Sequence, residues 1–379
     1  MNMLYLDYAA TTPLCKEVKE TYFHLLDTKF ANADSIHGLG LEVEGLMEKS
    51  RTMIAKKLNC KNTELIFTSG ASEANNLAIK GVCFQYANRG KHIITTAVEH
   101  SSVYETFKQL EELFGFNVTY LSVDRNGKLD LEQLKKSLTD QTILVSCMMV
   151  NNEVGMIFPI HEIRNILNDY PNCRFHVDMV QALGKIPIDL RDVDLASFSS
   201  HKIYGLKGSG LLFKRQNVQL KPLIAGGQQE FGLRAGTSNA ATNIVLAKTV
   251  RLALENLDEK YQKVKKLNMK LREYFDSLED CIINSPMDGS PYILNVSLLR
   301  YKPEVITHAY EEYEIYISTK SACSTKKNDI SRTLKAMNVG DDVGTTALRI
   351  SLSHAMSYED LDYFIKATNE ILRKVKKQK

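Results

Sequence analysis

Seven short apolar runs alternate with stretches of helical periodicity between Lys61 and Lys214, and this alternation restricts the fold more than any other feature of the sequence. The runs are continuous rather than broken by a polar residue at every second position, which is typical of strands covered on both faces. The sequence therefore predicts an α/β fold with a mostly parallel seven-stranded sheet and helical crossovers. The predicted strands are residues 65–68, 92–96, 117–122, 142–148, 174–177, 194–199 and 210–213.

A second pattern begins near Arg251. Apolar residues recur at helical spacing from Leu257 to Leu278 with Lys and Glu between them, which predicts a long amphipathic helix. The later elements are expected to be a strand at 292–297, a helix at 305–310, a strand-like run at 315–319 and a helix from Tyr358. We therefore expect a large domain at residues 16–255 and a smaller α+β domain formed by residues 1–15 and 256–379.

Composition excludes several classes of protein. The 379 residues carry 48 Lys and Arg against 45 Asp and Glu, so the formal net charge of +3 gives no global attraction to nucleic acid or to an acidic membrane. We find no signal peptide and no apolar run long enough to span a bilayer. The seven cysteines include no CxxC pair, which indicates neither a disulfide framework nor a structural zinc site. The sequence indicates a cytoplasmic enzyme without direct nucleic-acid or membrane partners.

A lysine follows the sixth predicted strand. Lys202 lies in the segment SFSSHKIYG, residues 197–205, beside hydroxyl side chains and a histidine. Parallel sheets place ligands at the carboxyl ends of their strands, and lysine is the side chain that forms a Schiff base with a carbonyl cofactor. A lysine after a strand is by itself more often a solvated charge, so the interpretation depends on other residues at strand ends.

Three such groups are present. The small-residue turn SGASE at residues 69–73 precedes a helix and can bind an anion through backbone N–H groups, although an ordinary capped turn has the same pattern. Asp178 ends a strand and could bind a protonated pyridine nitrogen, although it could equally be a helix N-cap. His100 follows another strand, where an imidazole could stack on a ring and handle protons. Together with Lys202 these groups describe a pocket for pyridoxal phosphate.

The chain also resembles a known family over nearly its whole length. Its motifs are similar to those of cysteine desulfurases, which belong to the class V aminotransferase group of pyridoxal-phosphate enzymes. The resemblance implies the fold type I architecture of these transferases and a homodimer. The motifs are LDYAATTP (6–13), FTSGASEANNLAIKG (67–81), VEH (98–100), VNNEVG (150–155), HVDMVQ (176–181), SFSSHKIYGLKG (197–208), RAGT (234–237) and SAC (321–323).

The resemblance implies a role for each matching cofactor residue. Lys202 would bind the cofactor covalently, His100 would stack on its ring, and Asp178 would hold the pyridine nitrogen. Gln181 would face the phenolic oxygen of the ring, and Asn152 would contact the cofactor as well as the substrate. The phosphate contacts would come from Ala71, Ser72, Ser199 and His201, and from Thr237 of the other subunit.

The remaining implied roles concern the substrate, L-cysteine. Asn152 and Arg349 would hold its carboxylate, with Arg349 forming a bidentate pair, and Asn32 would lie near it. Cys323 would take the sulfur as a persulfide, leaving L-alanine. It lies among small and polar residues with lysines nearby, which favours a reactive thiolate. The other cysteines lack this setting, and Cys83 and Cys147 lie within apolar runs.

The persulfide would pass to an acceptor protein, either an iron–sulfur scaffold or a sulfurtransferase for tRNA thiolation or thiocofactor synthesis. Several positions depart from the family pattern and favour the tRNA acceptor slightly: Ala33, Asp34, Phe231, Lys320 and His354. Three alternatives stay open at this point, namely a selenocysteine lyase, a class V aminotransferase without sulfur chemistry and a catalytically degenerate scaffold subunit.

Overall fold

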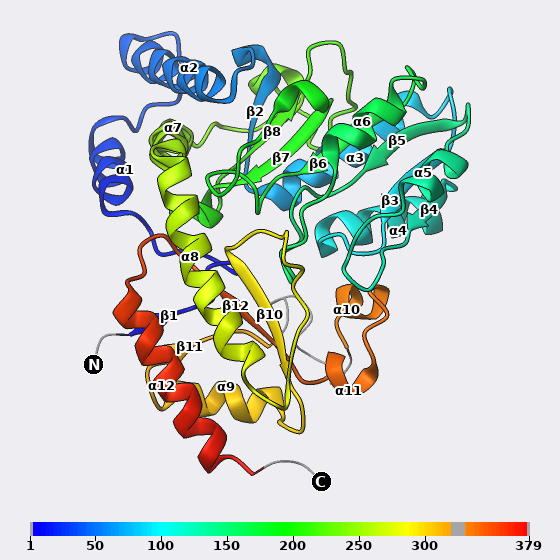
Figure 1. The fold of residues 1–379 in the computed structure, drawn as a ribbon. Helices are drawn as coiled ribbons and strands as arrows, with labels where there is room; N and C mark the ends of the chain where they lie inside the picture. The colour runs from blue at the N-terminus through cyan, green and yellow to red at the C-terminus, as the bar shows by residue number, and fades with distance from the viewer. Residues whose placement is uncertain (1–2, 320–329, 377–379) are drawn as a thin grey trace.

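The computed structural model describes residues 3–319 and 330–376. Its centre is a seven-stranded sheet in the order β2-β8-β7-β6-β5-β3-β4 (Figure 1). Only β8 runs antiparallel to its neighbours, so the predicted mostly parallel α/β sheet is confirmed. The strands are β2 (Leu65–Thr68), β3 (His92–Thr96), β4 (Asn117–Leu121), β5 (Thr142–Ser146), β6 (Arg174–Asp178), β7 (Leu195–Ser199) and β8 (Gly210–Lys214).

Helices cover both faces of this sheet because its strands are apolar on both sides. One face packs on α3 (Ala71–Tyr86) and α4 (Ser101–Phe114). The other face packs on α2 (Gly38–Leu58), α5 (Leu131–Ser137), α6 (Ile160–Leu167) and α7 (Ala240–Leu254). Helix α1 (Lys16–Thr28) packs on α7, and short 3₁₀ turns occupy Asn62–Glu64, Leu190–Asp192, Ser200–Lys202 and Gln229–Gly232.

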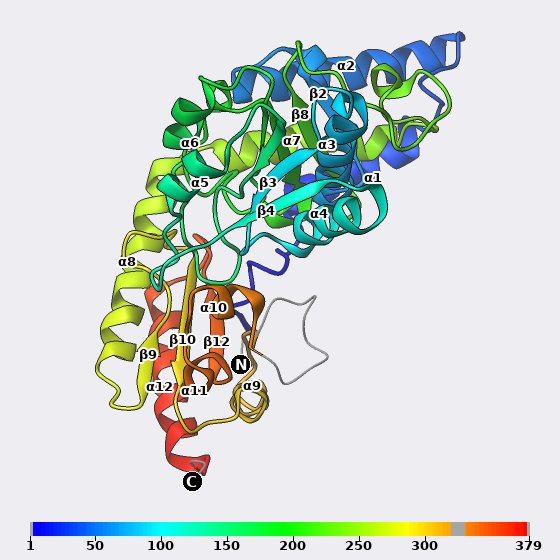
Figure 2. The same ribbon diagram turned by 90° about the vertical axis from the view of Figure 1, so that its right-hand side faces the viewer.

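A second group of elements lies below the large sheet in Figures 1 and 2. Its own apolar core joins the N-terminal Leu4 and Leu6 to residues between Val264 and Ile371. The group contains a three-stranded antiparallel sheet in the order β12-β10-β9 and a parallel pair of β1 and β11. The elements are β1 (Leu4–Tyr5), α8 (Leu257–Asp276), β9 (Cys281–Ile283), β10 (Ile293–Leu298), α9 (Pro303–Glu311), β11 (Ile315–Tyr316), β12 (Ala347–Ser351) and α12 (Tyr358–Lys374).

Two short helices, α10 (Arg332–Ala336) and α11 (Asp341–Gly344), connect these two groups. Leu334 and Met337 are buried in the core of the large sheet although they lie far beyond α7 in the sequence. The strand-like run at 315–319 forms only the two-residue strand β11. The polypeptide therefore crosses between the two cores more than once.

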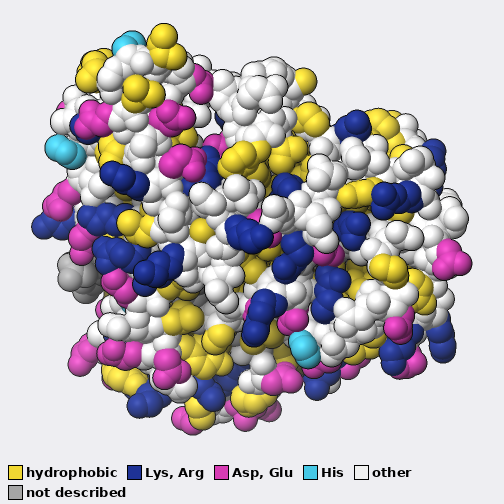
Figure 3. Space-filling view, turned by 90° about the horizontal axis from the view of Figure 1, so that it is seen from above, with side chains coloured by type: hydrophobic (Ala, Val, Ile, Leu, Met, Phe, Trp, Pro, Cys, Tyr) yellow, Lys and Arg dark blue, Asp and Glu magenta, His cyan; other side chains and the backbone are white. Residues whose placement is uncertain are grey.

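The surface seen in Figure 3 carries Lys and Arg side chains with Asp and Glu side chains between them and at the edges. This mixture agrees with the small formal net charge of +3. Within the two described ranges, no helix combines the length and the apolar character needed to cross a bilayer.

Candidate active site

A cavity of about 600 Å³ lies at the carboxyl ends of the strands in the large sheet. Parallel strands bring the loops that follow them to one edge, so residues far apart in the sequence meet there. The cavity brings together most of the residues predicted from the sequence: Ala71, Ser72, His100, Asn152, Asp178, Gln181, Ser199, His201, Lys202 and Arg349.

Lys202 lies at the end of the 3₁₀ turn that directly follows β7. Its Nζ donates to the carbonyl oxygens of Ala9 and Ala10, at 2.6 Å each. These carbonyls belong to the LDYAATTP motif at residues 6–13, whose pattern alone predicts no role for Ala9 or Ala10. The N-terminal segment therefore fixes where the amine of Lys202 points.

Asp178 is the last residue of β6 and is 5% exposed. Its Oδ2 accepts from Asn75 Nδ2 at 2.9 Å, and its Oδ1 accepts from the N–H of Val180 at 3.0 Å. Gln181 lies one turn further, where its Nε2 donates to Ala9 O at 3.0 Å. A buried carboxylate with neutral donors keeps its negative charge available for a cationic ring nitrogen in the cavity.

The start of α3 forms the anion-binding part of the cavity. Its N-cap is Gly70, no side chain caps its first turn, and its φ of +152° is one that side chains rarely adopt. The backbone N–H groups of Ala71 and Ser72 are therefore left for a ligand at the positive end of the helix dipole. Lys207 lines the same cavity and adds positive charge.

His100 is the N-cap of α4. Its Nδ1 accepts from the N–H of Ser102 at 3.1 Å and lies 2.8 Å from Ser102 Oγ. The ring forms part of the cavity wall, as a stacking role requires. Nearby His201 lies 3.1 Å from Thr11 Oγ1 through its Nδ1, and burial together with Lys202 lowers the pKa of His201 to about 4.

Arg349, in β12, is the cation at the opposite wall and is 2% exposed. Its Nη2 donates to Asp7 Oδ1 at 2.7 Å and its Nη1 donates to Asn152 O at 3.0 Å. Its buried Nε has no hydrogen-bond partner among the described residues. An arginine held in this way can bind the carboxylate of a small substrate.

These groups fit pyridoxal phosphate. A buried carboxylate, an uncapped helix N-terminus and a lysine amine are the three contacts that a phosphorylated pyridine aldehyde needs. The Glu73 carboxylate at the same wall is paired with Arg234 Nε at 3.0 Å, so its charge does not oppose a phosphate. The fit rests on the donor groups of the cavity, not on any bound molecule.

Two predicted site residues lie outside the cavity in this single chain. Asn32 is exposed, and its Oδ1 accepts from the N–H of Asp34 at 3.1 Å. Thr237 is also exposed. Cys323 and Lys320 lie outside the described residues.

The other six cysteines are poor candidates for a nucleophile. Among residues 3–319 and 330–376, no cysteine lines this cavity of about 600 Å³, and Cys15 lines a second cavity that also borders Lys202. Burial raises the thiol pKa in every case, which disfavours the reactive thiolate. The pKa rises to about 12 in Cys60, Cys173 and Cys281, and it also rises in Cys15, Cys83 and Cys147.

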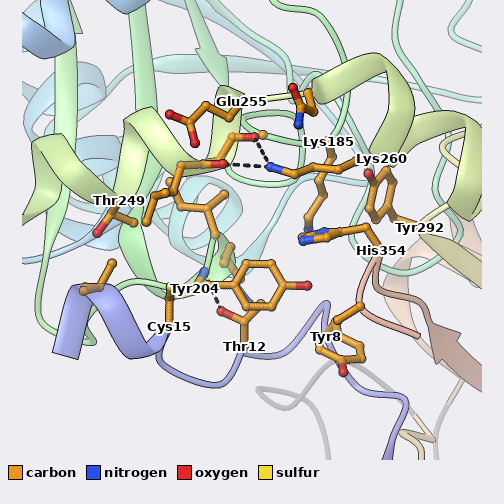
Figure 4. Close-up of a pocket in the computed structure, with 18 of the residues that line it drawn as sticks. Tyr8, Thr12, Cys15, Lys185, Tyr204, Thr249, Glu255, Lys260, Tyr292 and His354 are labelled. Carbon is orange, nitrogen blue, oxygen red and sulfur yellow. Dashed lines mark hydrogen bonds between the residues drawn. The ribbon is translucent and has the colours of Figure 1, made fainter. Parts of the chain in front are cut away.

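The departures that lie among the described residues, Ala33, Asp34, Phe231 and His354, do not line this cavity. Asp34 Oδ2 accepts from Gln229 Nε2 at 2.7 Å, at the surface. The ring of Phe231 lies 5.2 Å from the guanidinium of Arg51. His354 lines a second cavity of about 370 Å³ (Figure 4). Lys202 belongs to the lining of this cavity as well.

This second cavity contains the buried Lys185. Its Nζ donates to Gln181 Oε1 at 2.5 Å, and burial together with the charge of Lys202 lowers its pKa to about 7. Figure 4 shows Tyr204 and His354 around the same space. Burial, with smaller contributions from Lys260 and Lys263, lowers the pKa of His354 to about 4. His354 therefore adds a neutral imidazole here and no charge at neutral pH.

Glu99 gives the site a pH-dependent stability. Burial raises the pKa of its carboxyl to about 8, and the charge of Asp178 acts in the same direction. Between its unfolded value of about 4.5 and pH 8 the folded protein holds a proton that the unfolded chain releases, so the free energy of unfolding falls as the pH rises.

We expect Glu99→Gln to remove this loss. At pH 8.5 the free energy of unfolding of the variant should exceed that of the parent by roughly 2–5 kcal/mol. At pH 5 the two free energies of unfolding should agree. Denaturant unfolding at both pH values measures the difference. The control is Glu105→Gln, an exposed acid in the adjoining helix that should change neither value. Equal stabilities of parent and Glu99→Gln at pH 8.5 would show that Glu99 ionises normally.

Comparison with known proteins places this geometry in a family. The model of the aminotransferase class V family matches residues 4–364. The chain is 45% identical to a NifS/IcsS protein homolog of Lactobacillus delbrueckii subsp. bulgaricus over 97% of both chains. It is 42% identical to the cysteine desulfurase IscS of Dictyoglomus turgidum over 98% of this chain and 95% of that protein.

Solved structures agree with these relatives. A NifS-like protein superposes with a TM-score of 0.93 at 38% identity, over 99% of this chain and all of the other. The NifS-like protein of Rickettsia africae superposes with a TM-score of 0.87 at 32% identity, over 98% of this chain and all of the other. The predicted fold type I architecture is therefore confirmed. The chain belongs to the aminotransferase class V family, among its cysteine desulfurases.

Proposed function

We propose that the protein uses the cavity of Lys202 as a cysteine desulfurase that depends on pyridoxal phosphate. L-Cysteine and an enzyme thiol are converted to L-alanine and an enzyme persulfide, so the Cβ–S bond breaks, an S–S bond forms and no external oxidant is needed. The observation that carries the proposal is the convergence of Lys202, Asp178 and the N-terminus of α3 on one cavity, with Arg349 at its other wall.

Six residues would hold the cofactor besides Lys202. Asp178 would pair with the ring nitrogen and keep it protonated, while His100 would lie against the ring. The phosphate would receive the N–H groups of Ala71 and Ser72, and the side chains of Ser199 and His201. When bound, pyridoxal phosphate supplies an electron sink for negative charge at the substrate Cα.

Three side chains of the cavity would bind the substrate and transfer its protons: Arg349, Asn152 and Lys202. Arg349 and Asn152 would bind its carboxylate and so orient its Cα toward Lys202. The amine of Lys202 would remove the Cα proton and later return a proton to the product. Lys185 lies near Lys202 and donates a hydrogen bond to Gln181. Because the pKa of Lys185 is lowered, this residue adds less positive charge beside the amine of Lys202.

We expect Arg349→Lys to separate binding from chemistry. Lysine keeps the positive charge but loses the planar fork that binds a carboxylate with two hydrogen bonds. The KM for L-cysteine should rise about tenfold to a hundredfold, while kcat falls by a smaller factor. Steady-state alanine formation measures both constants. The matched control is Arg215→Lys, an arginine at the end of β8 whose hydrogen bonds go to backbone carbonyls outside the cavity. An unchanged KM in Arg349→Lys would remove this arginine from the substrate site.

The sulfur would be carried by Cys323. Two observations on described residues support this role. The other six cysteines have raised pKa values and lie outside the cavity. The segment leading toward Cys323 is fixed at the site, because Ser318 and Arg349 exchange backbone hydrogen bonds of 3.2 and 2.7 Å.

The proposal also covers the oligomeric state, the compartment, the domains and the sulfur acceptor of the enzyme. The protein would act in the cytoplasm as a homodimer in which Thr237 reaches the phosphate of the other subunit; its exposure here is compatible with that role. The chain would divide into residues 16–255 and a second unit of residues 1–15 and 256–379, in line with the separate core around Leu4 and Leu6. The persulfide would pass to an iron–sulfur scaffold or to a protein of tRNA thiolation.

The test is direct. Purified protein supplied with pyridoxal phosphate and a thiol reductant should release alanine and sulfide from L-cysteine in equal amounts. Loading with ³⁵S-cysteine in a cell extract should then label one acceptor protein or RNA. Conversion of L-cysteine to a keto acid without sulfide would instead identify an ordinary aminotransferase. Much faster turnover of selenocysteine than of cysteine would identify a selenocysteine lyase.

A further inference from the structure

A chain of hydrogen bonds joins Asp178 to His100 through Asn75 and Ser102, two residues that have no role in the proposed reaction. Asn75 Nδ2 lies 2.9 Å from Asp178 Oδ2 and 2.9 Å from Ser102 Oγ. Ser102 Oγ lies 2.8 Å from His100 Nδ1. Asn75 is fully buried in α3, and Ser102 lies in the first turn of α4.

The chemistry of Asp178 fixes the direction of this chain. An ionised carboxylate only accepts hydrogen bonds, so the nitrogen of the Asn75 amide must face it. The opposite orientation of the amide would set Asn75 Oδ1 against the carboxylate. Asn75 Nδ2 therefore donates one hydrogen to Asp178 and the other to Ser102 Oγ. The buried Oδ1 of Asn75 has no hydrogen-bond partner among the described residues, which shows that the amide is placed for its two N–H groups.

The proton of Ser102 must then go to His100. His100 Nδ1 accepts from the backbone N–H of Ser102, so this nitrogen is an acceptor and the Ser102 hydroxyl, 2.8 Å away, donates its hydrogen to it. The backbone N–H of Ser102 points at the same nitrogen at 3.1 Å, as the N-cap of α4. Two donors at Nδ1 leave no room for a proton on it. Neutral His100 therefore carries its proton on Nε2, the ring nitrogen turned away from α4.

We propose that Asn75 is a positioning residue that orients Asp178 and, through Ser102, holds His100 as the Nε2–H tautomer. His100 then presents an N–H donor to the cavity, not a vacant nitrogen. Under the proposed function, on which this last step rests, His100 donates a hydrogen bond to the negative charge on the substrate sulfur. His100 does not take the proton of the substrate thiol. Its Nε2 already carries a proton, and its Nδ1 already accepts hydrogen bonds from Ser102.

The tautomer can be measured without substrate. Protein labelled with ¹⁵N-histidine is studied by long-range ¹H–¹⁵N correlation at pH 8.5, with and without pyridoxal phosphate, and His100→Gln assigns the signal. Pyridine-type and pyrrole-type ring nitrogens have well separated shifts. We expect a pyridine-type Nδ1 and a protonated Nε2. A proton on Nδ1, or on both nitrogens, would overturn the proposal.

Variants then test the two arms of Asn75. Asn75→Leu has similar volume but no donors, so it should shift the Nδ1 signal of His100 and weaken pyridoxal-phosphate binding about tenfold or more. Ser102→Ala should shift the same signal and leave cofactor binding within about twofold. If Asn75→Leu does not fold, Ser102→Ala still tests the arm that reaches His100. An unchanged His100 signal in either variant would contradict the proposed chain.

Asn76→Ala is the matched control. Asn76 is the neighbouring asparagine of α3, and its amide donates only to Ser72 O within the helix, at 2.9 Å. It should alter neither the His100 signal nor the cofactor affinity. The readout also separates this inference from the proposed function. A protein without desulfurase activity but with an Nε2–H His100 contradicts only the function, and an active protein with an Nδ1–H His100 contradicts only the inference.

Discussion

Lys202→Ala protein should show no absorbance band from a lysine-bound cofactor and should turn over L-cysteine at least about a hundredfold to ten-thousandfold more slowly than the parent. The reason is that one amine serves both as the covalent anchor and as the base at the substrate Cα. It follows β7, and its Nζ is directed by hydrogen bonds to the carbonyls of Ala9 and Ala10, contacts that neither Lys185 nor Lys207 is seen to make. Absorbance spectra and alanine release measure the two effects.

The control for this substitution is Lys221→Ala. Lys221 is exposed and lies on the chain after β8, outside the cavity. Its loss should leave the spectrum and the rate unchanged. Borohydride reduction followed by mass spectrometry adds an independent check, because the parent should carry the reduced cofactor on residue 202. Steady turnover by Lys202→Ala, or a label on another residue, would contradict the assignment.

Cys323→Ser should keep the absorbance band of the bound cofactor and lose the release of sulfide from L-cysteine. The proposed cofactor contacts come from Lys202, Asp178, His100 and the start of α3, all of which the variant keeps, so the spectrum should persist. Sulfide release from L-cysteine with a reductant should fall by about a thousandfold or more, because a serine hydroxyl is a far weaker nucleophile than a thiolate. Sulfide assays and detection of a protein persulfide measure this loss.

Cys15→Ser and Cys281→Ser serve as matched controls. Both residues are only partly buried, and both have raised thiol pKa values. Neither lines the cavity of about 600 Å³ that holds Asp178 and Arg349, although Cys15 lines the second cavity beside Lys202. Each variant should keep the parent rate. If Cys323→Ser released sulfide normally while one of the controls did not, the sulfur carrier would have to be reassigned to that cysteine.

The fold was predictable wherever the signal was local. Strands such as β3 and β7 are continuous apolar runs bounded by turns, and their bounds follow from that pattern alone. The helix at Leu257–Asp276 follows from its apolar stripe. Strand β12 (Ala347–Ser351) was not predicted from its sequence. Helix α10 was not predicted either, because its contacts are with the core of the large sheet, whose strands lie more than a hundred residues away.

The site was predictable in its groups but not in its connections. Residues at strand ends, such as Asp178 and Lys202, follow from topology because parallel strands bring their ends together. The contacts of Asn75 with Asp178, and of Arg349 with Asp7, join residues separated by 103 and 342 positions. No periodicity records such pairs. The motif that contains Asn75 was recognised, but nothing in it distinguishes Asn75 from Asn76 until α3 is placed beside β6.

The short N-terminal segment has a practical consequence for anyone who handles this protein. Asp7 holds Arg349, while Ala9 and Ala10 hold Lys202, and the same stretch is fastened by the pairing of β1 with β11. A purification tag or fusion partner joined just upstream of β1 would lie close to the segment that positions Arg349 and Lys202, and could disturb both residues at once. The far end of α12 has no such contacts with the cavity and is the safer place for an attachment.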